Sequence, residues 1–358
     1  MTEQNSVSVS KHYNSVKEVG IDIRKESVIY HLRNFNNFIK SSVIQEFVSK
    51  LKEESFEGKF LDLCCGKGGD LKKWKMAGAK SVVMTDIAEV SLTQCVQRYQ
   101  ETEGKNRNPR YPTFEISVIH ADSSLVRLND FIPEEKKPFD LASCQFALHY
   151  AFETEAKARQ MIQNATENLK EGGYFVGTIP NANLILSLLR KEKKLFFENK
   201  VCKVTYLGEE TNMKSEEENL KDLMETNIPL FGSKIDWRLD DVVNCPEYLV
   251  HIPLLTKLME ECGMELVYCK RFDDALTYYS EVSGESKHLM ERIKVWEKYP
   301  CRSHEKQLHD DEEYEGAKAE YDKADNRRFF GTMGKCEWEI VSMYMVFAYR
   351  KKAGKTEN

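Results

Sequence analysis

The sequence predicts an α/β fold built on a mostly parallel sheet with helices on both faces. Short apolar runs suited to buried strands recur along the chain, and segments of helical periodicity lie between them. A glycine-rich turn directly follows the first apolar run. Strands that alternate with helices in this way are typical of parallel sheets covered on both sides.

The segment before the first strand is predicted to be helical within residues 11–57, after a flexible tail over residues 1–10. Its apolar residues recur at roughly helical spacing. Asn36, Asn37 and Lys40 fall on or near this helix. Adjacent asparagines are unfavourable inside a helix, so they either form a solvated face or are kept for their amide donors.

The glycine-rich turn is the centre of the sequence. Residues 60–63 suit a buried strand, glycines follow within residues 66–69, and a helix can start at Asp70. This layout brings backbone N–H groups close to a ligand, because a Cβ at the glycines would block the approach. With Cys64 in the first glycine position, the spacing fits nicotinamide or flavin loops and also S-adenosylmethionine (SAM) loops. A turn without a ligand is the third interpretation.

Polar residues end the next two predicted strands. Strand 81–85 ends at Asp86, about 20 residues past the turn, where a carboxylate can accept both hydrogen bonds from a ribose diol. Strand 114–119 runs toward Asp122 and Ser123, which can contact an adenine edge. Nicotinamide cofactors and SAM both carry these groups, so the placement does not choose between them.

The rest of the chain continues the α/β pattern with two charged insertions. Further strands are expected over residues 139–146, 174–179, 231–239, 244–250, 265–270 and 338–350, and helices over 87–99, 154–170 and 253–262. Gly172 and Gly173 are expected to stop the second of these helices. Residues 207–227 and 302–328 are rich in charge, and the first of these stretches is predicted to be mobile and solvated.

Composition excludes several classes of protein. Of the 358 residues, 41% are hydrophobic and 31% charged, as in ordinary globular domains, and no apolar stretch is long enough to cross a bilayer. Ten cysteines without a C-x-x-C pair argue for reduced thiols rather than a disulfide or zinc framework. A net charge of −6 argues against broad binding to long nucleic acid, but it allows a compact site for a phosphorylated end.

Several strings of the sequence resemble one family. They are HYN (12–14), LRNFNNFIKS (32–41), LDLCCGKGGDLKKW (61–74), TDIAEVS (85–91), QFALHYAFE (145–153), GGYFVGTIPN (172–181), CPEYLV (245–250) and SMYMVF (342–347). In this order, from about Lys11 to Lys351, they resemble the eukaryotic mRNA cap (guanine-N7) methyltransferases. The resemblance implies a Rossmann-like class I methyltransferase fold with a seven-stranded sheet, an N-terminal helical segment and inserted strands and loops. The implied reaction is methyl transfer from SAM to N7 of the terminal guanosine of 5′-triphosphate-capped mRNA.

The resemblance also implies two sets of site residues. Those expected at SAM are Lys40, Cys64, Gly66, Asp86, Asp122, Ser123, Gln145 and Tyr150. Those expected at the cap are Asn36, Asn37, Lys67, Lys73, Arg98, His149, Glu247 and Tyr344. We expect no metal, and no catalytic acid, base or nucleophile.

The chemistry of guanine N7 agrees with that expectation. N7 carries an exposed lone pair, so no proton has to leave before attack, and the protein's task is to align donor and acceptor. A carboxylate such as Glu247 can accept from guanine N1–H and the exocyclic amine, which adenine does not offer. The rings of Tyr150 and Tyr344 can face a delocalised cation. Without the resemblance, His149 is equally well a satisfied buried histidine.

Cys64 departs from the family, which has glycine there. A Cβ and a sulfur at the closest approach to SAM crowd the site, unless the backbone keeps φ below zero. Three alternatives to a cap methyltransferase stay open: a SAM methyltransferase for another substrate, a nucleotide-binding oxidoreductase that shares the turn and Asp86, and a non-catalytic cap-binding scaffold.

The resemblance implies a single domain over residues 11–351, followed by a tail over 352–358. Its expected parts are the helical segment 11–57, a SAM-binding core 58–181, an insertion with cap-side elements 182–260, and C-terminal core strands with a charged insertion 261–351. The expected location is the nucleus. The expected partners are capped RNA and other capping enzymes, the RNA polymerase II machinery or an activating subunit, with no membrane.

Overall fold

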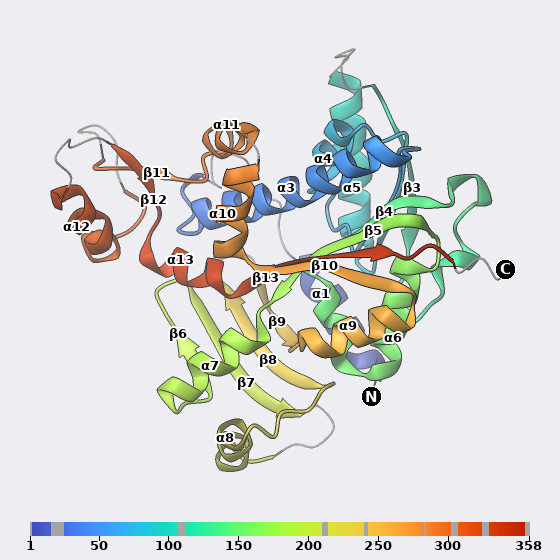
Figure 1. Cartoon of the computed structure of the whole chain (residues 1–358). Helices are drawn as coiled ribbons and strands as arrows, with labels where there is room; N and C mark the ends of the chain where they lie inside the picture. Colours follow the sequence, from blue (N-terminus) through green and yellow to red (C-terminus); the bar gives the residue numbers. More distant parts are fainter. Residues whose placement is uncertain are drawn as a thin grey trace.

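A seven-stranded sheet lies at the centre of the computed structural model, which describes residues 2–15, 25–105, 112–209, 214–239, 243–282, 284–301, 307–323 and 329–354. The strand order is β10-β13-β5-β4-β1-β2-β3 (Figure 1). These strands are β1 (Lys59–Leu63), β2 (Ser81–Asp86), β3 (Glu115–His120), β4 (Phe139–Gln145), β5 (Leu169–Pro180), β10 (Met264–Arg271) and β13 (Tyr344–Lys351). The pairs from β5 to β3 are parallel, and β13 is antiparallel to both of its neighbours. The predicted fold class is confirmed.

Helices cover both faces of this sheet (Figure 1). On one face lie α3 (Tyr30–Glu54), α4 (Leu71–Ala77) and α5 (Glu89–Lys105), and on the other α6 (Glu155–Thr166) and α9 (Ile252–Glu261). Alternate strand residues enter two separate apolar cores: Phe60 packs with α3, whereas Leu61 packs with α6 and α9. This alternation is the period of two that a strand buried on both faces requires.

A second, antiparallel sheet stands beside the first (Figure 1). It contains β6 (Phe196–Glu198), β7 (Cys202–Glu209), β8 (Ser233–Leu239) and β9 (Val243–Tyr248), with α7 (Ala182–Glu192) and α8 (Glu216–Glu225) close by. The remaining described elements are α10 (Phe272–Val282), α11 (Gly284–Arg292), β11 (Glu297–Tyr299), α12 (Glu315–Lys323), β12 (Phe330–Thr332), α13 (Lys335–Ser342) and the 3₁₀ turns η1 (Leu128–Asp130), η2 (Glu134–Lys136), η3 (Leu148–Glu153) and η4 (Asp311–Tyr314).

The N-terminus differs from its prediction. Residues 2–15 form helix α1 (Thr2–Ser15), where the sequence predicts a flexible tail over residues 1–10. Serine and asparagine give this segment weak helix propensity, so local sequence does not indicate the helix. Its contacts with α5 and β9 supply the stabilisation instead. The single domain over 11–351 and its four parts stay a prediction.

The prediction of a helix over 154–170 is wrong at the C-terminal end of the helix. Helix α6 ends at Thr166, and β5 begins at Leu169, so Gly172 and Gly173 lie inside a strand. Gly172 has φ +75°, and a Cβ on Gly173 would lie 3.0 Å from the carbonyl oxygen of Asp140. The two glycines therefore allow the strand to pass its neighbour closely, rather than stopping a helix.

Two further predictions need correction. The acidic stretch 207–227, predicted to be mobile, contains helix α8, which starts with a capping box between Ser215 and Glu218 and buries Leu223 completely. Residues 210–213 lie outside the described residues. The single strand predicted over 338–350 is α13 followed by β13. The buried residues Ile340 and Val341 lie four positions after Cys336 and Glu337, a helical spacing.

The charged stretch 302–328 is partly described. It contains η4 and α12, and residues 302–306 and 324–328 lie outside the described residues. Likewise, the helix predicted over 87–99 continues as α5 to Lys105, and residues 106–111 are not described.

Candidate functional site: a cavity at the carboxyl ends of the strands

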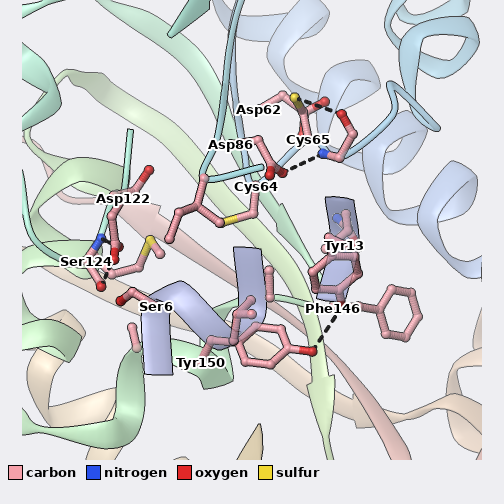
Figure 2. A pocket seen from close by; sticks show the side chains of 18 of the residues that line it. Ser6, Tyr13, Asp62, Cys64, Cys65, Asp86, Asp122, Ser124, Phe146 and Tyr150 are labelled. Carbon is pink, nitrogen blue, oxygen red and sulfur yellow. Dashed lines mark hydrogen bonds between the residues drawn. The ribbon is translucent and has the colours of Figure 1, made fainter. Parts of the chain in front are cut away.

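A cavity of about 370 Å³ opens where β1, β2 and β4 end. In parallel sheets these carboxyl ends are where ligands bind, and the volume suits a small ligand. Ten of the sixteen predicted site residues line it: Lys40, Cys64, Gly66, Lys67, Asp86, Arg98, Asp122, Ser123, Gln145 and Tyr150. Figure 2 shows Cys64 near the middle of the cavity, with Asp86 above it, Asp122 to its left and Tyr150 below.

The glycine turn has the geometry that the sequence predicts. Gly66 and Gly68 have φ of +53° and +70°, and a Cβ on Gly68 would lie 2.7 Å from the Cys95 sulfur. The backbone N–H of Gly66 donates to Oδ2 of Asp86 over 2.7 Å. The turn therefore orients the carboxylate that ends the next strand. Burial raises the pKa of Asp86.

Cys64 adopts a conformation that favours glycine. Its φ is +55°, so the condition under which a thiol would fit easily, a φ below zero, is not met. The side chain lines the cavity, beside the Cys144 thiol. That contact and burial raise the pKa of the Cys64 thiol well above its usual value. The thiol is therefore poorly suited to be a nucleophile.

Two lysines share one buried carboxylate beneath the turn. Lys40 Nζ and Lys73 Nζ each lie 2.8 Å from Oδ1 of Asp70. Burial alone would raise the pKa of Asp70, but the two ammonium groups outweigh it and hold that pKa well below its usual value. Burial, and then the negative charge of Asp70, raise the pKa of Asp62 to about 7. Oδ2 of Asp62 accepts a 2.8 Å hydrogen bond from Trp74.

The far end of the cavity offers an unused acceptor. Oδ1 of Asp122 accepts from the backbone N–H and the hydroxyl of Ser124, whereas its Oδ2 is buried without a hydrogen-bond partner among the described residues. An exocyclic amine such as that of adenine would satisfy this oxygen. Gln145 is held in place by Ser143 and Thr178. The Asp122 end of the cavity therefore suits the adenine of SAM, whereas Gln145 is predicted to lie on the methionyl side.

The residues predicted to surround the guanine lie one layer behind the cavity wall. Glu247 is 5% exposed; its Oε1 accepts from the hydroxyl of Tyr150 over 3.1 Å, and its Oε2 lies 3.3 Å from Nε2 of His149. Tyr344 packs its ring 5.1 Å from that of Phe146. Since Tyr150 and Phe146 line the cavity, they connect it to these buried groups.

The structure separates the cations predicted to bind phosphate. Lys67 and Arg98 line the cavity, but Lys73 does not. Lys73 Nζ also donates to Oδ1 of Asn37 over 3.0 Å, and burial lowers the Lys73 pKa. The half-buried Asn37 is thus bonded to Lys73 and to the carbonyl oxygen of Arg33, and the amide oxygen of its neighbour Asn36 is buried without a partner among the described residues.

Sequence reasoning missed the residues that α1 contributes. Ser6, Val9 and Tyr13 line the cavity, and the Tyr13 hydroxyl lies 3.0 Å from that of Tyr150. The string HYN belongs to the resemblance, but its spacing alone assigns Tyr13 no place. Among the described residues, no group of three or more His, Cys, Asp or Glu side chains could hold a metal ion. None of the described helices is long and apolar enough to span a membrane.

Comparisons with known proteins identify relatives over nearly the whole chain. The model of the mRNA (guanine-N(7))-methyltransferase domain matches residues 1–352. The mRNA cap guanine-N(7) methyltransferase of Caenorhabditis elegans is 43% identical over 98% of this chain and 88% of its own length. The rice mRNA cap guanine-N(7) methyltransferase 1 is 35% identical over 96% and 81%. A solved SAM-dependent methyltransferase from Clostridium acetobutylicum covers 90% of this chain and 92% of its own, with 12% identity and a TM-score of 0.42.

Proposed function

The chain belongs to the mRNA (guanine-N7)-methyltransferase family, and from this premise we infer how its residues carry out the reaction. It is a SAM-dependent enzyme that methylates N7 of the terminal guanosine of the mRNA cap. SAM supplies the methyl group as a sulfonium electrophile. The structural observation that supports this function is that all eight residues predicted for SAM line one cavity.

We propose that the glycine turn and the strand ends hold SAM. Asp86 accepts from the ribose hydroxyls, since Gly66 holds its carboxylate at the edge of the cavity. Asp122 uses its Oδ2, which has no hydrogen-bond partner in the described part of the chain, for the adenine amine. Lys40 faces the SAM carboxylate, while Asp70 keeps the Lys40 side chain in position. The chain thus binds and orients the donor through fixed polar groups.

The acceptor side of the proposal uses Glu247 as the guanine reader. Its carboxylate lies behind Tyr150, whose hydroxyl contacts both Glu247 and Tyr13. Guanine N1–H and the exocyclic amine reach the carboxylate when the Tyr150 hydroxyl gives up its bond to Glu247. His149 and Tyr344 then border the base, and Lys67 and Arg98 meet the phosphates. No proton is transferred, because N7 already exposes a lone pair.

A substrate comparison tests this function. The purified chain, labelled SAM, and GpppRNA or ApppRNA as acceptor should give label only in GpppRNA, in the cap. Equal labelling of both RNAs would reject the guanine-reading role. Label in neither RNA, with SAM bound normally, would favour a SAM methyltransferase for another substrate. NADH binding without binding of S-adenosylhomocysteine (SAH) would favour an oxidoreductase.

The proposal also covers the cellular location of the enzyme and its partners. The substrate is the cap of newly made mRNA, so the enzyme should act where mRNA is made. We therefore propose that it is located in the nucleus. Other capping enzymes, the RNA polymerase II machinery or an activating subunit are the proposed partners. Imaging of the tagged chain tests the location, and a purely cytoplasmic signal would reject it.

A further inference from the structure

Helix α1 forms a wall of the cofactor cavity along its length. Ser6, Val9 and Tyr13 line the cavity, and their spacing of three and four residues places them on one helix face. In Figure 2, Ser6 lies toward the end marked by Ser124, and Tyr13 lies toward Tyr150. The N-terminal part of α1 therefore faces the end of the cavity that suits adenine.

Two polar contacts attach α1 to the strand-end region on one side. The Ser10 hydroxyl donates to the carbonyl oxygen of Ile87 over 3.3 Å, and Oδ1 of Asn14 accepts from the backbone N–H of Val90 over 3.1 Å. Ile87 directly follows Asp86, the proposed ribose ligand. Neither Ser10 nor Asn14 lines the cavity, so these contacts hold the wall without forming it.

A buried ion pair anchors the other side. Lys157 and Glu153 are 4% and 7% exposed, their charged groups lie 2.5 Å apart, and both line the cavity. Nζ of Lys157 also donates to the Ser6 hydroxyl over 3.3 Å. Glu153 ends η3 and Lys157 lies in the first turn of α6, so the pair has a fixed position from which Lys157 holds Ser6 of α1 over the cavity. Neither motif nor spacing in the sequence predicts this arrangement.

We propose that Ser6 and Val9 belong to the cofactor site: they cover the adenosine end of SAM, and α1 has to move aside before SAM or SAH can leave. The inference rests on the proposed binding of SAM in this cavity. It adds a wall from the N-terminal helix to a site otherwise built from strand ends. The attachment of α1 then sets the rate at which the product SAH is exchanged for SAM.

The dissociation rate of SAH from the full chain tests the proposal. The double variant Ser10→Ala/Asn14→Ala removes two attachments without changing a cavity residue, and we expect SAH to leave ~3- to 10-fold faster, as the loss of one or two modest hydrogen bonds allows. Val9→Ala, which thins the wall itself, should act in the same direction. Ser8→Ala, at an exposed position of the same helix, is the matched control. Identical dissociation from the double variant and the wild type would overturn the proposal.

Hydrogen exchange of the wild-type chain provides a second test that needs no variant. Saturation with SAH should slow amide exchange in residues 6–15, because the ligand keeps the wall closed. Unchanged exchange there, with slower exchange in residues 64–70, would show that SAH binds without α1 and would also overturn the proposal. Failure of SAH to bind at all would reject the proposed function instead, so the two failures are distinguishable.

Discussion

The cofactor side and the cap side of the site are constructed differently. On the cofactor side, Asp86 and Asp122 sit at or just after strand ends of one sheet, where backbone groups such as the Gly66 N–H hold the side chains, and Lys40 joins them from α3. On the cap side, His149, Glu247 and Tyr344 come from η3, β9 and β13, which belong to different parts of the fold. All three are at most 6% exposed.

The difference shows which parts of the fold position the residues of each half. The cofactor side depends mainly on one sheet and its turns, to which α3 adds Lys40 and α1 adds the wall. The cap side needs the second sheet to dock on the first, because Glu247 meets Tyr150 across that junction. We therefore expect substitutions on the cofactor side to act mainly on binding of SAM, and those on the cap side to act on turnover of capped RNA.

Glu247→Gln should have the largest effect. The amide cannot accept from both guanine donors, so kcat/KM for GpppRNA should fall about 10- to 100-fold, while SAH affinity stays within about twofold. Asp236→Asn, a carboxylate on the neighbouring strand that pairs with Arg238, is the control. Unchanged turnover of GpppRNA by Glu247→Gln would contradict the expected division between a cofactor side and a cap side.

Asp86→Asn should weaken SAH binding about tenfold, as measured by calorimetry. The ribose hydroxyls lose a charged acceptor, and so does the N–H of Gly66. Glu89→Gln, a nearby exposed carboxylate in the first turn of α5, should change nothing. If Asp86→Asn lowered turnover without weakening SAH, the carboxylate would not be a ribose ligand.

Asp62 should make stability depend on pH. Its pKa is raised from 3.8 to about 7, so the folded state binds the proton more tightly than the unfolded state does. Its contribution to stability is complete below about pH 4 and is lost as the pH rises toward 7. In Asp62→Asn the urea-unfolding free energy should fall less between pH 5 and pH 8 than in the wild type, by about 1–2 kcal/mol. Parallel pH profiles would contradict this.

Substitutions of Lys67 and Lys73 should have different effects, the first on binding of capped RNA and the second on the free energy of unfolding. Lys67→Met should raise KM for capped RNA about threefold, since Lys67 lines the cavity. Lys73→Met should leave that KM nearly unchanged and lower the unfolding free energy by about 1 kcal/mol, because Asp70 loses one of two cations. If Lys73→Met raised KM for capped RNA and Lys67→Met did not, Lys73 would be a phosphate ligand after all.

Cys64→Gly should have a small effect, in the direction of tighter binding. Glycine adopts a φ of +55° without the steric cost that cysteine bears, so SAH affinity should rise about two- to fivefold. Calorimetry on both forms checks this. Affinity that falls in the glycine variant would show that the thiol contributes to the site. SAM binding seen only in the glycine variant would support the scaffold function.

The sequence by itself determined the central sheet and the strand-end residues of the cofactor side. Apolar strands, positive-φ glycines and strand-end carboxylates such as Asp86 act over a few residues, so their spacing predicts their structure. The resemblance then predicted a role for Glu247 and Tyr344 at the guanine, which no local pattern connects to the site.

Only the tertiary structure decided the rest. Helix α1 has weak propensity and depends on contacts with α5 and β9, so it was predicted as a tail. Lys73 carries the charge of a phosphate ligand, but packing commits it to Asp70 and Asn37. The wall over the cavity and the partner of each cation depend on distances between segments remote in sequence, which composition and spacing do not encode.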